Sequence, residues 1–185
     1  ALGLERPFYE LDARWSAGLS AESLSQVENR YALGTRVDSW RADRQAFDIH
    51  RGWSSGLRGD WTRRWTAGFR YDRARFAPAD TALVGPLPDD RTLALPYMRL
   101  DLLQDDYVTA HNLDQIGRTE DLRFGTQLSA ELGVSQAALG ANRNAFVASL
   151  GASRGYRLVH EQSLFLAGSW GSRLEGGSLR DSLLS

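Results

Sequence analysis

The sequence predicts an all-β protein, an antiparallel up-and-down β-barrel that crosses a membrane, on three observations. Apolar and polar residues alternate along several segments, so that one face of each strand meets an apolar medium. These segments are about 12–20 residues long, whereas strands of soluble proteins usually have about 5–6. The connections between them are alternately long and short, as in barrels of the bacterial outer membrane.

The segment from Tyr9 to Ser20 has the clearest alternation, and we expect it to be the first long strand, after an entry segment over residues 1–8. Its apolar face would carry Tyr9, Leu11, Ala13, Trp15, Ala17 and Leu19. Its other face would carry Glu10, Asp12, Arg14, Ser16, Gly18 and Ser20.

The next part of the chain is expected to be a loop over residues 26–36, followed by one long strand from Val37 to Leu57. Two shorter strands with a turn near residues 41–43 are the alternative. Arg51 interrupts the apolar face of this strand, and a lipid-facing Arg at mid-depth costs about 2–4 kcal/mol. Either Arg51 lies near a membrane interface or a β-bulge resets the register there.

A tight turn at residues 58–60 is expected to lead into the strand from Trp61 to Phe76. Trp53, Trp61 and Trp65 flank this turn, as in the aromatic girdle of a membrane barrel. A Trp-lined small core at one end of a soluble sheet is the alternative interpretation.

The rest of the chain continues the pattern. The expected elements are a loop at 77–90, a strand at 92–112, a turn at 113–117, a strand at 121–134, a loop at 135–143, a strand over 146–153, a turn at 156–160, a strand at 163–170, a turn at 175–177 and an incomplete strand from 178. We expect residues 1–185 to be one partial barrel domain of about 7–8 long strands, with no separate periplasmic module.

Alternation assigns the side chains of these strands to two environments. A lipid-facing surface requires only apolar residues, while an aqueous lumen suits opposite charges that pair across strands. The lipid-facing residues are predicted to be Tyr9, Leu11, Trp15, Leu19, Trp65, Phe69, Tyr71, Leu100, Leu122, Phe124, Leu128, Leu132, Phe146 and Leu150. The lumen-facing residues are predicted to be Glu10, Asp12, Arg14, Asp48, His50, Arg70, Asp72, Arg99, Asp101, Asp121, Arg123 and Glu131.

Composition and motifs give no sign of catalysis. The formal net charge is −1, which argues against nucleic acid as a partner, and there is no Cys. His50, His111 and His160 lie far apart, and no Ser lies in a Gly-x-Ser-x-Gly motif. The acids Asp89, Asp90, Asp105 and Asp106 are interpreted as solvated loop charge. We therefore expect no enzyme activity, no metal and no cofactor.

Residues 1–6 lack the features of a signal peptide, and no apolar run is long enough for a transmembrane helix.

Four stretches carry a resemblance to a known family: residues 6–15 (RPFYELDARW), 52–57 (GWSSGL), 64–72 (RWTAGFRYD) and 117–125 (GRTEDLRFG). They resemble the barrel of the outer-membrane assembly-factor superfamily, the BamA/TamA-like surface antigens. The resemblance implies the N-terminal half of a sixteen-stranded barrel in the bacterial outer membrane, with outer-membrane lipid and client polypeptides as partners. It also implies a role in the insertion or translocation of proteins. The family's Arg-Gly-aromatic loop tip is not carried over, because Arg51-Gly52-Trp53 lies inside an expected strand.

Three other functions remain open at this point. A polar lumen alone would suit a passive porin or channel, and a barrel enzyme that acts on lipids is a further possibility. A soluble β-sandwich binding domain would also alternate apolar and polar residues. In a sandwich, however, Leu11, Trp15, Phe69 and Leu128 would converge inside a two-layer core.

Overall fold

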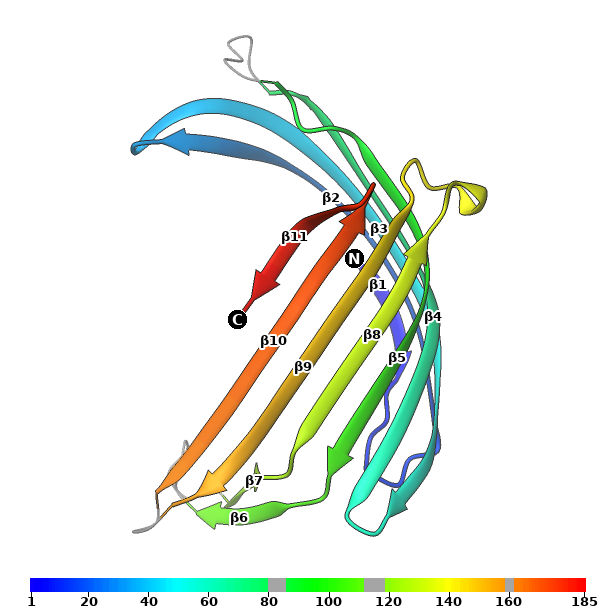
Figure 1. Ribbon diagram of the computed structural model, residues 1–185, viewed down its shortest axis with the longest axis vertical. Coiled ribbons are helices and arrows are strands. Elements are labelled where there is room, and N and C mark those ends of the chain that lie inside the picture. The colour runs from blue at the N-terminus through cyan, green and yellow to red at the C-terminus, as the bar shows by residue number, and fades with distance from the viewer. Residues whose placement is uncertain (80–85, 112–118, 159–161) are drawn as a thin grey trace.

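The computed structural model describes residues 1–79, 86–111, 119–158 and 162–185 (Figure 1). Within these residues the protein is all-β and antiparallel, as the sequence predicts. The one helical element described is a short 3-10 helix, η1 (Ala137–Leu139).

Nine strands form one sheet in the order β1-β2-β3-β4-β5-β8-β9-β10-β11, and β6 and β7 form a separate two-stranded sheet. The strands of the main sheet are β1 (Leu2–Arg6), β2 (Trp15–Ala32), β3 (Thr35–Arg58), β4 (Trp61–Pro78), β5 (Arg91–Gln104), β8 (Gln127–Ser135), β9 (Ala145–Arg157), β10 (Ser163–Glu175) and β11 (Ser178–Leu184). The short pair is β6 (Tyr107–His111) and β7 (Thr119–Arg123).

The main sheet is strongly curved and open. In Figure 1, β8–β11 lie nearest the viewer, β4 and β5 form the bend, and β1–β3 lie behind. Among the described strands, β1 and β11 are the two edges and do not pair with each other. The up-and-down antiparallel arrangement is therefore confirmed, whereas the described residues do not close a barrel. They also place no second layer against the main sheet, as a sandwich would require.

The expected loop at 26–36 is wrong, because β2 and β3 stay paired through these residues and extend past the end of β4, which pairs with β3 as far as Trp40, as a two-stranded ribbon. Leu33 and Gly34 connect them with φ values of 50° and 80°, the positive values that a two-residue hairpin turn requires. The ribbon is polar on both faces, so it gives no alternation signal. Side chains stabilise it, since Arg44 contacts Glu28 at 2.6 Å and Trp40 donates to Glu28 at 3.1 Å.

The expected first strand is also partly wrong. Residues 7–14 do not form a strand, while residues 2–6, expected to be an entry segment, form β1 and pair with β2. Residues 7–14 fold as a connection with a turn, in which the Ala13 amide donates to the Glu10 carbonyl at 3.1 Å. Alternation over Tyr9, Leu11 and Ala13 is therefore not the alternation of a strand.

The long strands expected at 92–112 and 121–134 are both interrupted. β5 ends at Gln104 and β8 begins only at Gln127, so β6 and β7 form a separate hairpin between them. At this corner the Asp106 carbonyl accepts the amides of Phe124 and Gly125, at 2.8 and 2.9 Å. The backbones approach too closely there for the strands to continue straight.

The other connections agree with the sequence. Gly59 in the β3–β4 turn has a φ of 60°, and Gly176 and Gly177 in the β10–β11 turn have φ values of 57° and 81°. A long connection follows β4 and a connection of intermediate length follows β8, as expected. The expected turn at 113–117 lies outside the described residues, as do residues 159–160 of the turn expected at 156–160. β9 continues to Arg157, so that turn begins later than expected.

Candidate functional site

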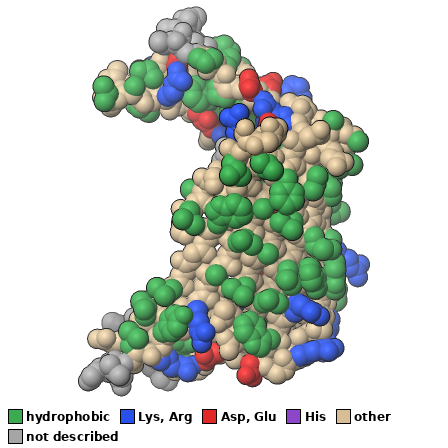
Figure 2. All heavy atoms as spheres, viewed as in Figure 1, with side chains coloured by type: hydrophobic (Ala, Val, Ile, Leu, Met, Phe, Trp, Pro, Cys, Tyr) green, Lys and Arg blue, Asp and Glu red, His purple; other side chains and the backbone are tan. Residues whose placement is uncertain are grey.

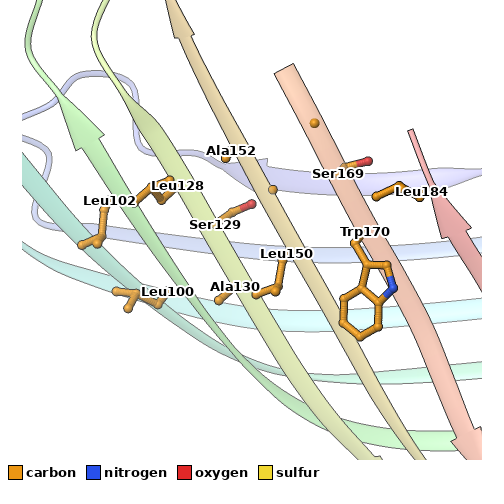
Figure 3. Close-up of a pocket in the computed structure, with 12 residues that line it drawn as sticks. Leu100, Leu102, Leu128, Ser129, Ala130, Leu150, Ala152, Ser169, Trp170 and Leu184 are labelled. Atoms are coloured by element: carbon orange, nitrogen blue, oxygen red, sulfur yellow. The ribbon is translucent and has the colours of Figure 1, made fainter. Parts of the chain in front are cut away.

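The two faces of the curved sheet differ in chemistry, and together they are the candidate functional site. On the convex face, an apolar row crosses eight strands from β2 to β11. Register places its members side by side: Trp15, Trp53, Trp65, Leu100, Ala130, Leu150, Trp170 and Leu184. Figure 3 shows Leu100, Ala130, Leu150 and Trp170 following one another across β5, β8, β9 and β10. We call this set the apolar row.

Further apolar residues lie beside the apolar row, and together they form an apolar band. They include Leu19, Phe47, Ile49, Phe69, Tyr71, Met98, Leu102, Leu128, Leu132, Val134 and Phe146. Figure 2 shows hydrophobic side chains spread over the near face of the sheet, with charged side chains gathered towards its two ends. Large side chains in the band are exposed: Trp15 is 43% exposed and Leu150 is 52% exposed. No described element covers the band.

The band contains a shallow apolar groove of about 600 Å³ between the apolar row and the neighbouring row of Leu102, Leu128, Ala152 and Gly168. Small residues at Ala130, Ala152 and Gly168 form its floor. The groove therefore continues the apolar band and does not add a polar site to it.

Arg51 lies within the apolar band, and the structure excludes one of the two explanations offered for it. Register runs unbroken through Arg51, which pairs with Ala17 on one side and Ala67 on the other. The nearest β-bulge in the β3–β4 pair falls between Ser54 and Leu57. A bulge at Arg51 is thus excluded, and two small neighbours leave its exposed side chain free to extend along the face.

On the concave face, charged and polar side chains form a connected network. Asp48 contacts His50 Nδ1 at 2.9 Å and accepts a hydrogen bond from the Tyr97 hydroxyl at 3.2 Å. Arg70 bridges two carboxylates, Asp48 at 3.3 Å and Glu131 at 3.0 Å. Its guanidinium also lies 4.7 Å from the centre of the Tyr97 ring. Side chains from β3, β4, β5 and β8 are thereby tied together, as expected for polar groups paired across strands.

Glycines let the rings of this network lie flat against the neighbouring strands. Gly68 lies beneath Tyr97, and a Cβ there would approach the Tyr97 hydroxyl to 2.6 Å. Gly18 lies beneath His50, where a Cβ would overlap the imidazole ring. The alternation of Gly and polar residues on this face is therefore part of its packing.

The segment 7–14 covers the concave face near the β3–β4 turn. The Phe8 ring lies against Gly52 and stacks with Arg64, whose guanidinium is 4.8 Å from the ring centre. The Glu10 carbonyl accepts from Arg64 at 2.8 Å, and the Leu11 carbonyl accepts from Thr62 at 2.9 Å. Next to this segment is a polar hollow of about 570 Å³ that includes His50, Arg70 and Glu131 in its lining.

A separate ion-pair cluster lies at the end of β10, next to the β10–β11 turn. Arg143 donates to Glu175 at 2.7 Å and to Asp89 at 3.3 Å, and Arg173 donates to Glu175 at 3.1 Å. The hydrogen bond from Arg143, together with the charges of both arginines, holds the pKa of the Glu175 carboxyl below its ordinary value.

This cluster predicts a loss of stability in acid. Because the pKa of Glu175 is lower in the folded state, its contribution is complete above the unfolded carboxyl pKa of about 4.3 and is lost as the pH falls through the folded value. Glu175→Gln should lower the free energy of unfolding by about 1 kcal/mol at pH 7 and have little effect near pH 3. Denaturant titrations between pH 7 and pH 3 measure this. Glu22→Gln, which removes an exposed carboxylate without a described ion pair, should show no such difference between the two pH values.

Most of the predicted side-chain directions agree with a two-faced sheet. Ten of the residues predicted to face lipid lie on the convex face: Trp15, Leu19, Trp65, Phe69, Tyr71, Leu100, Leu128, Leu132, Phe146 and Leu150. Those on the concave face are Asp48, His50, Arg70, Asp72, Arg99, Asp101 and Glu131.

The other predicted site residues lie outside the long strands. Tyr9, Glu10, Leu11, Asp12 and Arg14 belong to the segment 7–14, so strand alternation does not apply to them. Leu122, Asp121 and Arg123 lie on β7 of the small hairpin.

Phe124 is a clear error of the face assignment. It is only 4% exposed and packs against Phe165 with ring centres 5.2 Å apart. It also lies against Gly155, on the concave side. The close backbone contact at Gly125 turns the chain here, so the alternation that continues from Leu122 does not predict the direction of Phe124.

Tyr97 and Phe8 are central to the concave face but are not among the predicted site residues. Alternation does place Tyr97 on the polar face of β5 with Arg99 and Asp101, and the structure agrees. Nothing in the local sequence signals that Phe8 folds back over β3 and β4.

The described residues show no arrangement typical of a metal centre, since no three of their His, Asp and Glu side chains converge. No helix among them is long and apolar enough to span a membrane. His50 is the one histidine whose side chain is described, and its Nδ1 is engaged by Asp48.

The fold and its two faces define a class: an antiparallel β-sheet protein with an exposed apolar band on one side and a paired-charge surface on the other. Comparison with known proteins finds no matching family model, no matching curated protein and no matching solved structure.

Proposed function

We propose that this chain forms part of the wall of a transmembrane β-barrel in the bacterial outer membrane, with the apolar band towards lipid and the concave face towards an aqueous lumen. The observation that carries the proposal is the apolar row, which runs unbroken across eight strands while the opposite face carries charge. In water, an uncovered apolar surface of this extent would be costly, because exposed apolar patches of soluble monomers are usually limited to a few hundred Å².

The dimensions of the band support a bilayer. On the convex face of β4, Arg63 and Arg73 flank the apolar residues Trp65, Ala67, Phe69 and Tyr71. The two arginines are about ten residues apart, which is about 33 Å of strand. At a strand tilt of about 40° this corresponds to about 25 Å of thickness, the height of the apolar band of outer-membrane barrels.

Within this class, we propose a protein of the BamA/TamA-like superfamily that inserts or translocates other proteins and is not an enzyme. The four stretches of family resemblance support this assignment. The segment 7–14 supports it over a passive porin, because it occupies part of the concave face where a solute would have to pass. A porin remains the second candidate, since the hollow beside this segment is polar and open.

Tryptophan fluorescence tests the membrane proposal directly. Five of the six Trp residues, at positions 15, 53, 61, 65 and 170, lie on the convex face. Trp40 points to the other face, where it donates to Glu28. After folding into phosphatidylcholine vesicles with brominated acyl chains, most of the fluorescence should be quenched, and the remainder should come from Trp40. Unquenched fluorescence, or protein that stays in the aqueous phase after flotation, would refute the proposal.

A second measurement separates assembly from passive conduction. Vesicles that contain the protein should accelerate the folding of a small outer-membrane barrel added as an unfolded client. Ion conductance without any such acceleration would favour the porin.

A further inference from the structure

The arginines of β3, β4 and β5 differ in their hydrogen-bond partners between the two faces of the sheet. On the concave face each is hydrogen-bonded to an acceptor: Arg44 to Glu28, Arg64 to the Glu10 carbonyl, Arg70 to Asp48 and Glu131, Arg91 to Asp72, and Arg99 to Asp101. Where β3, β4 and β5 pair with one another, the arginines of the convex face are Arg41, Arg51, Arg58, Arg63, Arg73 and Arg75. Arg36 lies beyond them, in the part of β3 that pairs with β2 alone. Among the described residues, none of these six has an acidic or other hydrogen-bonding partner.

Three of the unpaired guanidinium groups lie together at one boundary of the apolar band. The last apolar pair there is Phe47 and Tyr71. The next convex-face positions along β4 are Arg73 and Arg75, and Arg41 lies two residues beyond Asp43, the cross-strand partner of Arg75. We call Arg41, Arg73 and Arg75 the arginine patch. Two carboxylates lie beside the patch, Asp43 across from Arg75 and Asp90, which accepts the neighbouring Phe76 amide, so the local charge is +1. Arg41 and Arg75 are exposed.

We propose that the arginine patch binds the phosphate groups of anionic lipid headgroups. This inference rests on the proposed function, because it requires the apolar band to meet lipid. Guanidinium groups match phosphate oxygens in geometry and charge, and they remain charged at any relevant pH. Each Arg near an anionic membrane surface strengthens binding by about fivefold.

Position on the sheet favours a lipid over other anions. The patch continues the same face as the apolar band, so its ligand must present a phosphate immediately beyond an apolar region. A membrane lipid has this arrangement, with acyl chains against the band and a phosphate at its boundary. Tyr71, directly beside Arg73, suits the same level, since Tyr is enriched where membranes meet water. A soluble anion would gain nothing from the adjacent band.

Lipid binding to the detergent-folded chain tests the proposal. The variant Arg73→Gln/Arg75→Gln removes two charges from the patch. The control Arg44→Gln/Arg91→Gln removes two charges from neighbouring positions on the concave face of β3 and β5. Native mass spectrometry would measure the binding of phosphatidylglycerol and phosphatidylcholine to each protein, and thermal unfolding would verify that each is folded.

The wild type should prefer phosphatidylglycerol, and the patch variant should lose about tenfold to thirtyfold of that preference, while the control keeps it. High salt should weaken the preference. The proposal is wrong if the patch variant retains the full preference, if the control loses as much, or if inorganic phosphate alone binds the patch as tightly as the lipid does. Insertion into neutral phosphatidylcholine vesicles separates the two proposals: normal insertion without an anionic preference overturns only this inference, whereas failure to insert overturns both.

Discussion

Replacing Leu150 by Arg is expected to destabilise the protein in a bilayer by about 2–4 kcal/mol, while leaving its stability in an aqueous setting almost unchanged. Leu150 is 52% exposed, lies in the apolar row near the middle of the β9 part of the band, and pairs with Ala130 and Trp170. An exposed Leu of a soluble sheet tolerates Arg, because the guanidinium remains hydrated. A Leu that faces hydrocarbon does not, because the charge must leave water.

The comparison needs a matched substitution on the other face. Ser149→Arg introduces the same side chain one residue away, beside Glu131 on the concave face, where Gly171 leaves space. Urea titrations of both variants in phosphatidylcholine vesicles, followed by Trp fluorescence, give the two free energies of unfolding. A large loss for Leu150→Arg alone supports the lipid-facing band. Equal effects of the two variants would mean that the convex face is not in hydrocarbon.

Replacing Gly125 by Ala is expected to cost about 3 kcal/mol, the largest effect of a single added methyl group in this sheet. A Cβ at Gly125 would overlap the Gln104 carbonyl oxygen and approach the Asp106 nitrogen to 3.1 Å. These are backbone atoms, so no side-chain rotation can relieve the contact. The corner between β5 and β8 would have to open, which would weaken the hydrogen bonds from Phe124 and Gly125 to Asp106.

Gly168→Ala is the matched control, since a Cβ there meets only the Ser185 carbonyl oxygen, at 3.7 Å. Its free energy of unfolding should stay within about 0.5 kcal/mol of the wild type. Denaturant midpoints of the two variants in the same detergent measure the difference. Similar midpoints would show that the close approach at Gly125 does not constrain the corner.

Alternation predicted the strands of this sheet where one face is apolar and the other polar. The paired turns at Gly59 and at residues 176–177 were also predictable, because Gly supplies the positive φ that they require. On β4 and β8–β9 the assigned faces follow directly from period two, since each strand is straight enough to keep its register.

The parts that could not be predicted are those in which contacts between distant residues decide the structure. The β2–β3 ribbon is polar on both faces, so its strands have no amphipathic pattern and are recognised only by their pairing. Residues 7–14 alternate by composition, yet the carbonyls of Glu10 and Leu11 accept hydrogen bonds from the side chains of Arg64 and Thr62 on β4. Only at the end of the segment does the backbone bond to a strand, where the Arg14 carbonyl accepts the Ser54 amide of β3. At Phe124, a single close backbone contact overrides the pattern. The concave-face network was only partly predictable, because its charged members follow from alternation whereas the place of Phe8 does not.

The order of strands has a consequence for how the chain folds. Except where β6 and β7 intervene between β5 and β8, each strand of the main sheet pairs with its immediate successor. Contacts are therefore formed mainly between residues close in the chain, and the loop-closure entropy of each new pairing is small. Among the described residues, tight turns that contain glycine join β2 to β3, β3 to β4 and β10 to β11, and the sheet can grow hairpin by hairpin from any of them. Only residues 105–126 must be looped out before pairing resumes, so we expect the barrier to folding to arise mainly at the junction of β5 with β8.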